Sequence, residues 1–334
     1  MSINSIEADW KRFESEWKAP SPCLEVQTSG STGTPKRMQV RKEQMIYSAR
    51  MTLSYLGLRP GDKALLCLPL RYIAGKMMAV RAWVGGLDLL LREPSGHPLA
   101  EVTEPIRFAA MIPMQVYNSL KVEEERRLLR DIKHLIIGGG AINRDMAEEL
   151  RGFPNAVWST YGMTETLSHI ALRRLSGAEA SEWYEPFDGV GVTTSADGCL
   201  VIDAPAVCAH PLVTNDIAEI APDGRRFRIR GRRDNVVCSG GLKLQIEEME
   251  ARLQPHLNVP YMISKRPDDK FGEAVVLLAV TDDMESVCEV CRKHMPRYEQ
   301  PRYFLAVSEL PMTPTGKPAR AEAMKLCAAM TSGK

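Results

Sequence analysis

A chain of 334 residues is long enough to bury a large core and to form two domains, one large and one small. Its 43 Lys and Arg residues balance 42 Asp and Glu residues, so a net charge of +1 provides no general field for nucleic acid or an anionic membrane. The sequence has neither a signal-peptide core nor an apolar run long enough for a membrane span, which predicts a soluble cytoplasmic protein.

The first elements alternate between helix and strand. Ile6, Trp10, Phe13 and Trp17 recur at helical spacing before Pro20, which predicts an opening helix that docks on the body. Residues 24–27 then predict a strand that enters a glycine-rich loop, and residues 41–58 predict a helix after that loop. Strand, loop and helix together predict the start of an α/β unit.

Later segments predict three further regions. Apolar strands alternate with helices up to residue 161, which favours a mostly parallel sheet buried on both faces. Residues 199–232 are β-rich, with a turn at Asp223 and Gly224. From residue 234 a hairpin, a Glu-rich helix, two strands and a helix near residues 285–296 predict a small α+β domain. We therefore expect a large α/β domain at 1–232 and a mobile C-terminal domain at 233–334.

The eight cysteines lie in otherwise apolar runs, which predicts reduced, mostly buried thiols. Cys288, Cys291 and His294 have the spacing of half a zinc site. No second Cys or His pair lies nearby, and the segment has helical periodicity, so we interpret this spacing as coincidental.

The stretch "QTSGSTGTPK", residues 27–36, combines hydroxyl groups, glycines and a lysine, which are the groups that surround an oxyanion. Only two residues separate Gly30 from Gly33, whereas the common nucleotide P-loop has four between its glycines. The stretch therefore predicts a phosphate site of another kind.

Five more stretches follow in order: "GGGAI" (138–142), "STYGMTET" (159–166), "TND" (214–216), "GRRDNVVCSGGLKL" (231–244) and "PTGK" (314–317). Each one alone is typical of an ordinary turn or loop. Their joint order resembles the adenylate-forming superfamily of acyl- and aryl-CoA ligases, luciferases and peptide-synthetase adenylation domains, over residues 28–317. That resemblance implies ATP, Mg²⁺ and coenzyme A as reactants or cofactor, and an acyl-adenylate intermediate.

The resemblance also implies roles for individual residues. The leaving phosphates of ATP would be held by Thr28, Ser29, Gly30, Ser31, Thr32, Gly33 and Lys36. The adenosine and its α-phosphate would be held by Gly139, Gly140, Ala141, Tyr161, Gly162, Met163, Thr164, Asp216 and Arg232. A hydroxyl and a hard carboxylate oxygen suit Thr164 and Glu165 to the α-phosphate and to Mg²⁺, which makes Glu165 the predicted metal ligand.

Three further roles lie in the C-terminal part. Lys317 matches the family's catalytic lysine, which bridges the substrate carboxylate and the α-phosphate. Asp234 matches the hinge about which the small domain turns between the two half-reactions. Gly240, Gly241 and Lys243 would line the path of the CoA thiol, because a backbone without side chains leaves room for a thin pantetheine arm.

One departure from the family pattern concerns the N-terminal side. Family members carry an α/β subdomain before the phosphate-binding loop, and here only residues 1–27 precede it. We expect the surface that such a subdomain would cover to be protected by the helix of Trp10 and Trp17 or by homodimerisation.

Within the family, residues 161–172 and 234–250 are most similar to the o-succinylbenzoate-CoA ligases of menaquinone biosynthesis, and Gly75 and Arg81 fit a glycine and arginine of those enzymes. o-Succinylbenzoate has a second carboxylate that needs a fixed cation, and a guanidinium can bind it bidentately. Arg81 could equally be a charge on a helix surface. Ser168 and His169 are weaker candidates for the acid pocket.

Three alternatives remain open at this point. Another aryl- or acyl-CoA ligase would not need Arg81. A non-catalytic regulator that binds nucleotide or CoA would bind ATP without releasing pyrophosphate. A phosphotransferase is the weakest alternative, because the glycine loop has the wrong spacing and Lys317 would have no role.

Overall fold

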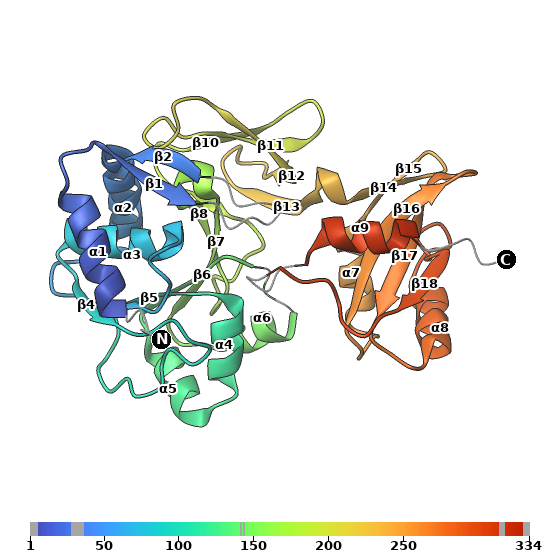
Figure 1. The fold of residues 1–334 in the computed structure, drawn as a ribbon, viewed down its shortest axis with the longest axis horizontal. Coiled ribbons are helices and arrows are strands. Elements are labelled where there is room, and N and C mark those ends of the chain that lie inside the picture. Colours follow the sequence, from blue (N-terminus) through green and yellow to red (C-terminus); the bar gives the residue numbers. More distant parts are fainter. Residues whose placement is uncertain (1–5, 28–36, 141, 143, 314–317, 330–334) are drawn as a thin grey trace.

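A computed structural model describes residues 6–27, 37–140, 142, 144–313 and 318–329. Its centre is a seven-stranded sheet (Figure 1). In spatial order the strands are β4 (Asp88–Leu91), β3 (Lys63–Leu66), β5 (Phe108–Met111), β6 (His134–Ile137), β7 (Ala156–Gly162), β8 (His169–Arg174) and β9 (Glu185–Pro186). The strands from β4 to β7 are parallel, while β8 and β9 are antiparallel to their neighbours, which confirms a mostly parallel sheet.

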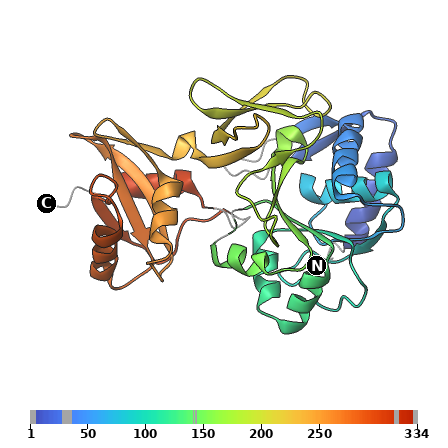
Figure 2. The same ribbon diagram turned by 180° about the vertical axis from the view of Figure 1, so that it is seen from behind.

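Both faces of this sheet are buried, because alternate residues of each strand enter different cores. In β5, Phe108 and Ala110 belong to one core, and Ala109 and Met111 belong to the other. The helices α2 (Lys42–Leu56) and α3 (Ile73–Gly85) pack in the first core. The second core contains α4 (Pro113–Leu120), α5 (Glu123–Asp131) and α6 (Arg144–Arg151), and Figures 1 and 2 show these helices on the other side of the sheet.

The prediction of a strand, loop and helix at residues 24–58 was wrong in one respect. The strands β1 (Cys23–Gln27) and β2 (Arg37–Arg41) pair as an antiparallel two-stranded sheet that flanks residues 28–36, and only then does α2 begin. The sequence carries the reason, since polar residues alternate with Met38 and Val40 across β2, which is the pattern of a half-buried strand. Residues 28–36 therefore join two antiparallel strands, and they do not lead from a strand of the parallel sheet into a helix.

The predicted β-rich region is confirmed as an antiparallel sheet. Its strands are β10 (Gly191–Thr194), β11 (Cys199–Asp203), β12 (Leu212–Ile220) and β13 (Phe227–Arg232). The predicted turn lies between β12 and β13, where Gly224 has a φ of 70°. This sheet lies at the top of Figure 1, beside β1, β2 and β8.

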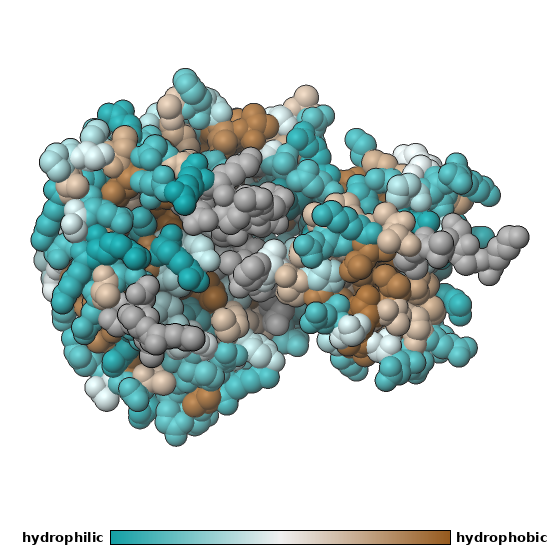
Figure 3. All heavy atoms as spheres, viewed as in Figure 1, coloured by the Kyte–Doolittle hydropathy of each residue, from teal (hydrophilic) through white to brown (hydrophobic). Residues whose placement is uncertain are grey.

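The C-terminal part is a five-stranded sheet with three helices. The strands are β14 (Val236–Ser239), β15 (Leu242–Gln245), β16 (Tyr261–Asp268), β17 (Gly272–Ala279) and β18 (Tyr303–Ala306), and the helices are α7 (Ile246–Leu253), α8 (Met284–His294) and α9 (Arg320–Ala329). The sequence predicted all of these except β18 and α9. Its two buried clusters use only residues from Val237 onward. Figure 3 shows apolar side chains at the surface around α9. We keep the domain boundary at residue 233 as a proposal.

The helix α1 (Ile6–Lys18) docks on α3 through a cluster of aromatic rings. The rings of Trp10, Phe13 and Trp17 lie 5.1, 5.5 and 5.5 Å from the ring of Trp83, between ring centroids. The ammonium of Lys76 lies 5.0 Å above the Phe13 ring. The predicted docking of this helix on the body is therefore confirmed. Among the described helices, none is both long and apolar enough to cross a membrane.

The aromatic cluster generates a stability prediction. Phe13 is 2% exposed, so Phe13→Ala should lower the free energy of unfolding by about 3 kcal/mol through lost apolar burial and a residual cavity. Urea unfolding followed by tryptophan fluorescence measures this change. All five tryptophans precede residue 184, so their fluorescence reports unfolding of the part of the chain to which α1 belongs. Lys11→Ala, on the exposed side of the same helix, is the matched control. A loss as small as that of the control would mean that α1 is not docked in solution.

Candidate active site

Two glycine-bearing segments leave the sheet at the same edge. Because β6 and β7 are parallel neighbours, Gly138–Gly140 and Gly162–Met163 both follow carboxyl ends of strands, where open α/β sheets bind ligands. A Cβ atom on Gly138 would overlap the hydroxyl of Thr160, so only glycine lets the two strand ends pack this closely. Gly139 has a φ of 81°, in the region that favours glycine. The predicted adenine-binding glycines thus lie beside the Tyr161 segment.

The segment from Gly162 to His169 reverses the chain between β7 and β8. A Cβ atom on Gly162 would overlap the backbone of Ser168 and His169. Thr166, which is fully buried, holds the reversal closed: its hydroxyl accepts from the Met163 N–H at 3.0 Å and lies 2.8 Å from the Ser168 carbonyl oxygen. The next residue, Leu167, has a φ of 65°, and this backbone conformation is strained for a residue as bulky as leucine.

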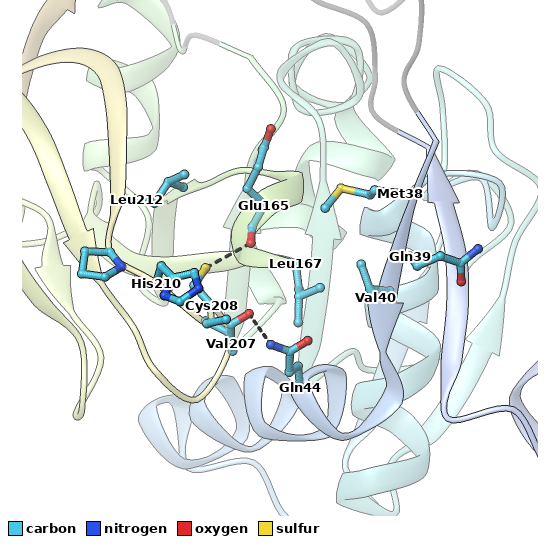
Figure 4. Close-up of a pocket in the computed structure, with 12 residues that line it drawn as sticks. Met38, Gln39, Val40, Gln44, Glu165, Leu167, Val207, Cys208, His210 and Leu212 are labelled. Atoms are coloured by element: carbon cyan, nitrogen blue, oxygen red, sulfur yellow. Dashed lines mark hydrogen bonds between the residues drawn. The ribbon is translucent and has the colours of Figure 1, made fainter.

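Glu165 lines an open cleft of about 320 Å³ between β2, α2 and the segment before β12. Figure 4 shows its carboxylate projecting at one end of this cleft, while Gln44 lies at the other end and donates to the Val207 carbonyl at 3.0 Å. The backbone carbonyl of Glu165 accepts from the Cys208 thiol at 3.1 Å. The cleft thus places the Glu165 segment opposite β2, the strand that directly follows residues 28–36.

The chemistry of Glu165 fits a hard divalent cation. Its exposed carboxylate has no ion-pair partner in the described part of the chain, and oxygen donors are the ligands that Mg²⁺ prefers. Within the described ranges no group of three or more His, Cys, Asp or Glu side chains is placed to hold a metal alone. Mg²⁺ is usually bound by one or two carboxylates together with substrate phosphate oxygens and water.

A second group of predicted residues surrounds Asp216. One carboxylate oxygen accepts from the Tyr161 hydroxyl at 2.6 Å, and the other accepts from Arg232 at 3.1 Å. Burial, followed by the neighbouring Asp216 charge, raises the pKa of Tyr161 well above its usual value, so the phenol stays a donor. The Tyr161 ring packs edge-on against Phe227 at 5.1 Å. Each Asp216 oxygen keeps a lone pair for a ribose hydroxyl.

The three predicted acid-pocket residues are brought together by two elements that are distant in sequence. Arg81 on α3 donates from Nη2 to Ser168 Oγ at 2.6 Å. Ser168 Oγ in turn lies 3.3 Å from Nδ1 of His169. Arg81 is only 2% exposed, so the alternative of a helix-surface charge is wrong.

Arg81 is a buried cation that no anion among the described residues pairs with. No described carboxylate lies within ion-pair distance, and its Nε has no hydrogen-bond partner. Burial lowers the pKa of Arg81 to about 9, because desolvation disfavours the charged form. Burial of an unpaired guanidinium is costly, and an incoming carboxylate would offset that cost.

Other predicted residues lie near the junction with the C-terminal part. Asp234, in the short helix η2 (Arg233–Asn235), accepts from Arg232 at 3.1 Å and from Asn215 at 3.3 Å. Gly240 and Gly241 form the tip of the β14–β15 hairpin with φ values of 59° and 84°, as glycines in a two-residue turn do. Lys243 follows on β15 and is exposed. The structure does not place these hairpin residues beside the nucleotide residues.

Some predicted residues lie outside the described ranges, and their roles stay predictions. They are Thr28, Ser29, Gly30, Ser31, Thr32, Gly33, Lys36, Ala141 and Lys317.

Sequence reasoning missed two hydroxyl residues of this region. Thr166 belongs to the quoted stretch "STYGMTET", and its position after Glu165 could have suggested a turn-closing hydroxyl. Thr52 on α2 lies 3.0 Å from Nε2 of His169, through Oγ1. Its place on the apolar face of a helix gives no signal in the sequence, because its partner lies 117 residues away.

Comparisons with known proteins agree with this arrangement. The profile described as AMP-binding enzyme matches residues 4–208, and the profile described as AMP-binding enzyme C-terminal domain matches residues 248–317. The 2-succinylbenzoate–CoA ligase of Bacillus pumilus is 26% identical over 345 aligned positions, which cover 92% of this chain and 69% of that protein.

Solved structures show the same fold. An acyl-CoA synthetase (AMP-forming)/AMP-acid ligase II-like protein from Dyadobacter fermentans is 32% identical, with a TM-score of 0.67, over 96% of this chain and 95% of that one. The o-succinylbenzoate CoA synthetase of Bacillus subtilis, in complex with its acyl-adenylate intermediate OSB-AMP, is 22% identical, with a TM-score of 0.77 over 93% of this chain and 70% of that one. The first profile alone matches more than half of the 334 residues, and the chain therefore belongs to the AMP-binding enzyme family.

Proposed function

We propose that this chain is an ATP-dependent, AMP-forming acid–CoA ligase that acts on o-succinylbenzoate. Family membership and the relatives named 2-succinylbenzoate–CoA ligase support the ligase chemistry. The observation that carries the choice of acid is Arg81, a buried guanidinium that faces no carboxylate of the described chain and is bound to Ser168. An acid with a second carboxylate would supply the missing anion.

In the first half-reaction, the acid's reacting carboxylate attacks the α-phosphate of ATP, which gives the acyl-adenylate and pyrophosphate. Asp216, held by Tyr161 and Arg232, would orient the ribose. Thr164 would bind the α-phosphate. Glu165 would hold Mg²⁺, which, when bound, neutralises charge on the phosphates. Lys317 would stabilise the charge that moves between the carboxylate and the phosphate.

In the second half-reaction, the CoA thiolate displaces AMP from the acyl-adenylate. We propose that the C-terminal part turns at Asp234 for this step, so that Gly240, Gly241 and Lys243 come to line the path of the thiol.

We also make proposals about the cellular location of the protein and about its assembly. We place the protein in the cytoplasm, and all eight cysteines being unpaired is consistent with a reducing compartment. We propose that α1, whose rings contact Trp83, covers the surface that the family's N-terminal subdomain would otherwise cover. A homodimer across the same face remains a proposal.

The ligase assignment predicts an ATP–pyrophosphate exchange that depends on acid and does not require CoA. Purified protein with ATP, Mg²⁺ and radiolabelled pyrophosphate should exchange label with o-succinylbenzoate, and less with benzoate, phenylacetate or short fatty acids. Lys317→Ala should slow exchange by about a hundredfold or more, the scale for losing one electrostatic group of a transition state. ATP binding without exchange for any acid would favour the regulator alternative instead.

The acid assignment predicts a selective effect at Arg81. Arg81→Gln should lower kcat/KM for o-succinylbenzoate by a factor that corresponds to about 2 to 4 kcal/mol, the scale for losing one partner of a buried charge pair. 4-Oxo-4-phenylbutanoate, which lacks the ring carboxylate, is the control substrate and should be little affected. If both acids lose activity equally, the ligase stands and the o-succinylbenzoate assignment falls.

A further inference from the structure

A continuous chain of polar contacts connects Arg81 to the backbone of α2. Arg81 Nη2 lies 2.6 Å from Ser168 Oγ, which lies 3.3 Å from His169 Nδ1. His169 Nε2 lies 3.0 Å from Thr52 Oγ1, and Thr52 Oγ1 lies 3.3 Å from the carbonyl oxygen of Ser48. Three elements that are distant in sequence thus meet through four hydrogen bonds.

One arrangement of protons satisfies all four bonds. The Ser48 carbonyl can only accept, so the Thr52 hydroxyl donates to it and must accept from His169 Nε2–H. A neutral imidazole with its proton on Nε2 accepts at Nδ1, so the Ser168 hydroxyl donates there. The remaining lone pairs of Ser168 then accept from Arg81, which has donors only.

Burial makes this arrangement hard to replace. Thr52 is completely buried, His169 is 6% exposed and Arg81 is 2% exposed. Loss of one of these hydrogen bonds would have one of two results. It would leave a buried donor or acceptor unsatisfied, or it would shift His169 to the tautomer with its proton on Nδ1, which would then point at Ser168. In the second case Ser168 would receive two donors and its own proton would lose its acceptor.

The guanidinium of Arg81 has further N–H donors for which the described residues provide no acceptor. Its Nε has no partner, and the bond to Ser168 is the only hydrogen bond recorded for the guanidinium among the described residues. The orientation of those free donors therefore depends on where Ser168 is held. A planar fork binds a carboxylate well only at a fixed angle.

We propose that Thr52 and His169 are positioning residues: they fix Ser168 as an acceptor, Ser168 fixes Arg81, and the guanidinium is thereby aimed at the second carboxylate of the acid. This inference rests on the proposed function, because it assumes that Arg81 binds such a carboxylate. It assigns His169 to positioning rather than to substrate contact and adds a residue of α2 to acid selection.

The variant that tests the proposal is Thr52→Val, which keeps the shape of the side chain and removes the hydroxyl. We expect KM for o-succinylbenzoate to rise about tenfold, the factor for one hydrogen bond in a buried network, with kcat within about twofold. For 4-oxo-4-phenylbutanoate, KM should stay within about twofold. Thr52→Ser restores the hydroxyl and should return KM to within about threefold of the wild-type value.

A matched control separates positioning from general loosening of the fold. Ser119→Ala removes another fully buried hydroxyl, one that donates to Glu125 at 2.8 Å in the opposite core. It should lower the melting temperature without changing the KM ratio of the two acids. If Thr52→Val raised KM equally for both acids, this inference would be overturned while the proposed function would stand. A wild-type enzyme without preference for o-succinylbenzoate over the analogue would overturn the proposed function, and this inference with it.

A second measurement tests the neutral imidazole directly. Burial and the adjacent Arg81 charge lower the pKa of His169 well below 6.5, while the unfolded chain keeps the ordinary value. Below that pH the unfolded state gains a proton that the native state excludes, so stability is lost as pH falls. The groups facing His169 are the Arg81 guanidinium, the hydroxyls of Thr52 and Ser168 and the Phe187 ring.

The unfolding equilibrium constant of the wild type should therefore rise more than that of His169→Gln between pH 7 and pH 5.5, by up to roughly eightfold. Burial also lowers the pKa of His134, to about 4, but its contribution to the pH dependence of unfolding is the same in both proteins and cancels in the comparison. Parallel pH profiles would mean that His169 takes up a proton in the native state as readily as in the unfolded chain, which would overturn the proton arrangement and the inference.

Discussion

The close approach of Gly162 to the backbone of Ser168 and His169 is the constraint on which the site depends. Because glycine has no Cβ atom, the backbone at Gly162 can approach that of Ser168 and His169 closely, and the chain can fold back from β7 to β8 within seven residues. One short reversal then presents Glu165 to the open cleft and His169 to the buried interior. The residues predicted for metal, phosphate and acid are consequently fixed relative to one another by a single piece of backbone.

The interior side of that reversal holds an unusual combination of charge and polarity. Burial of a guanidinium without a counterion is costly, and among the described residues only the Ser168 hydroxyl hydrogen-bonds to it, while His169 and Thr52 extend the polar chain behind that serine. Neutral dipoles solvate a cation less well than a carboxylate does. The native state therefore carries a cost that binding of an anionic group would relieve, which ties the energetics of the fold to the selection of a ligand.

Local sequence patterns predicted much of this arrangement. Apolar runs and glycines located the parallel strands and their carboxyl ends, because burial on both faces leaves a clear pattern. The joint order of the motifs pointed to Asp216, Tyr161 and Arg232, which the structure brings together. The burial of Arg81 was undecided, since one charged residue in an apolar helix has the same local pattern whether it faces solvent or the core.

Long-range partners explain what could not be predicted. Thr52 and His169 are 117 residues apart, and neither neighbourhood encodes the other. The same applies to the opening helix: its aromatic spacing predicted a docking face, but only the packing identifies Trp83 as the ring that receives it. The strand β2 was missed for a different reason: residues 37–40 lie between the glycine-rich stretch and the helix predicted from residue 41, and a half-buried strand of five residues leaves only a short alternating pattern.

Arg232 has a consequence for how the two parts of the chain can move. Its guanidinium is shared between Asp216, which is largely buried, and Asp234, whose side chain is 50% exposed. The carboxamide of Gln245 also reaches across the junction, to the Arg232 carbonyl at 3.0 Å. Exposed ion pairs are weak and are screened by salt, so these contacts define an orientation without trapping it. The proposed rotation at Asp234 would need two orientations of nearly equal free energy, since a deep minimum for either one would slow every turnover.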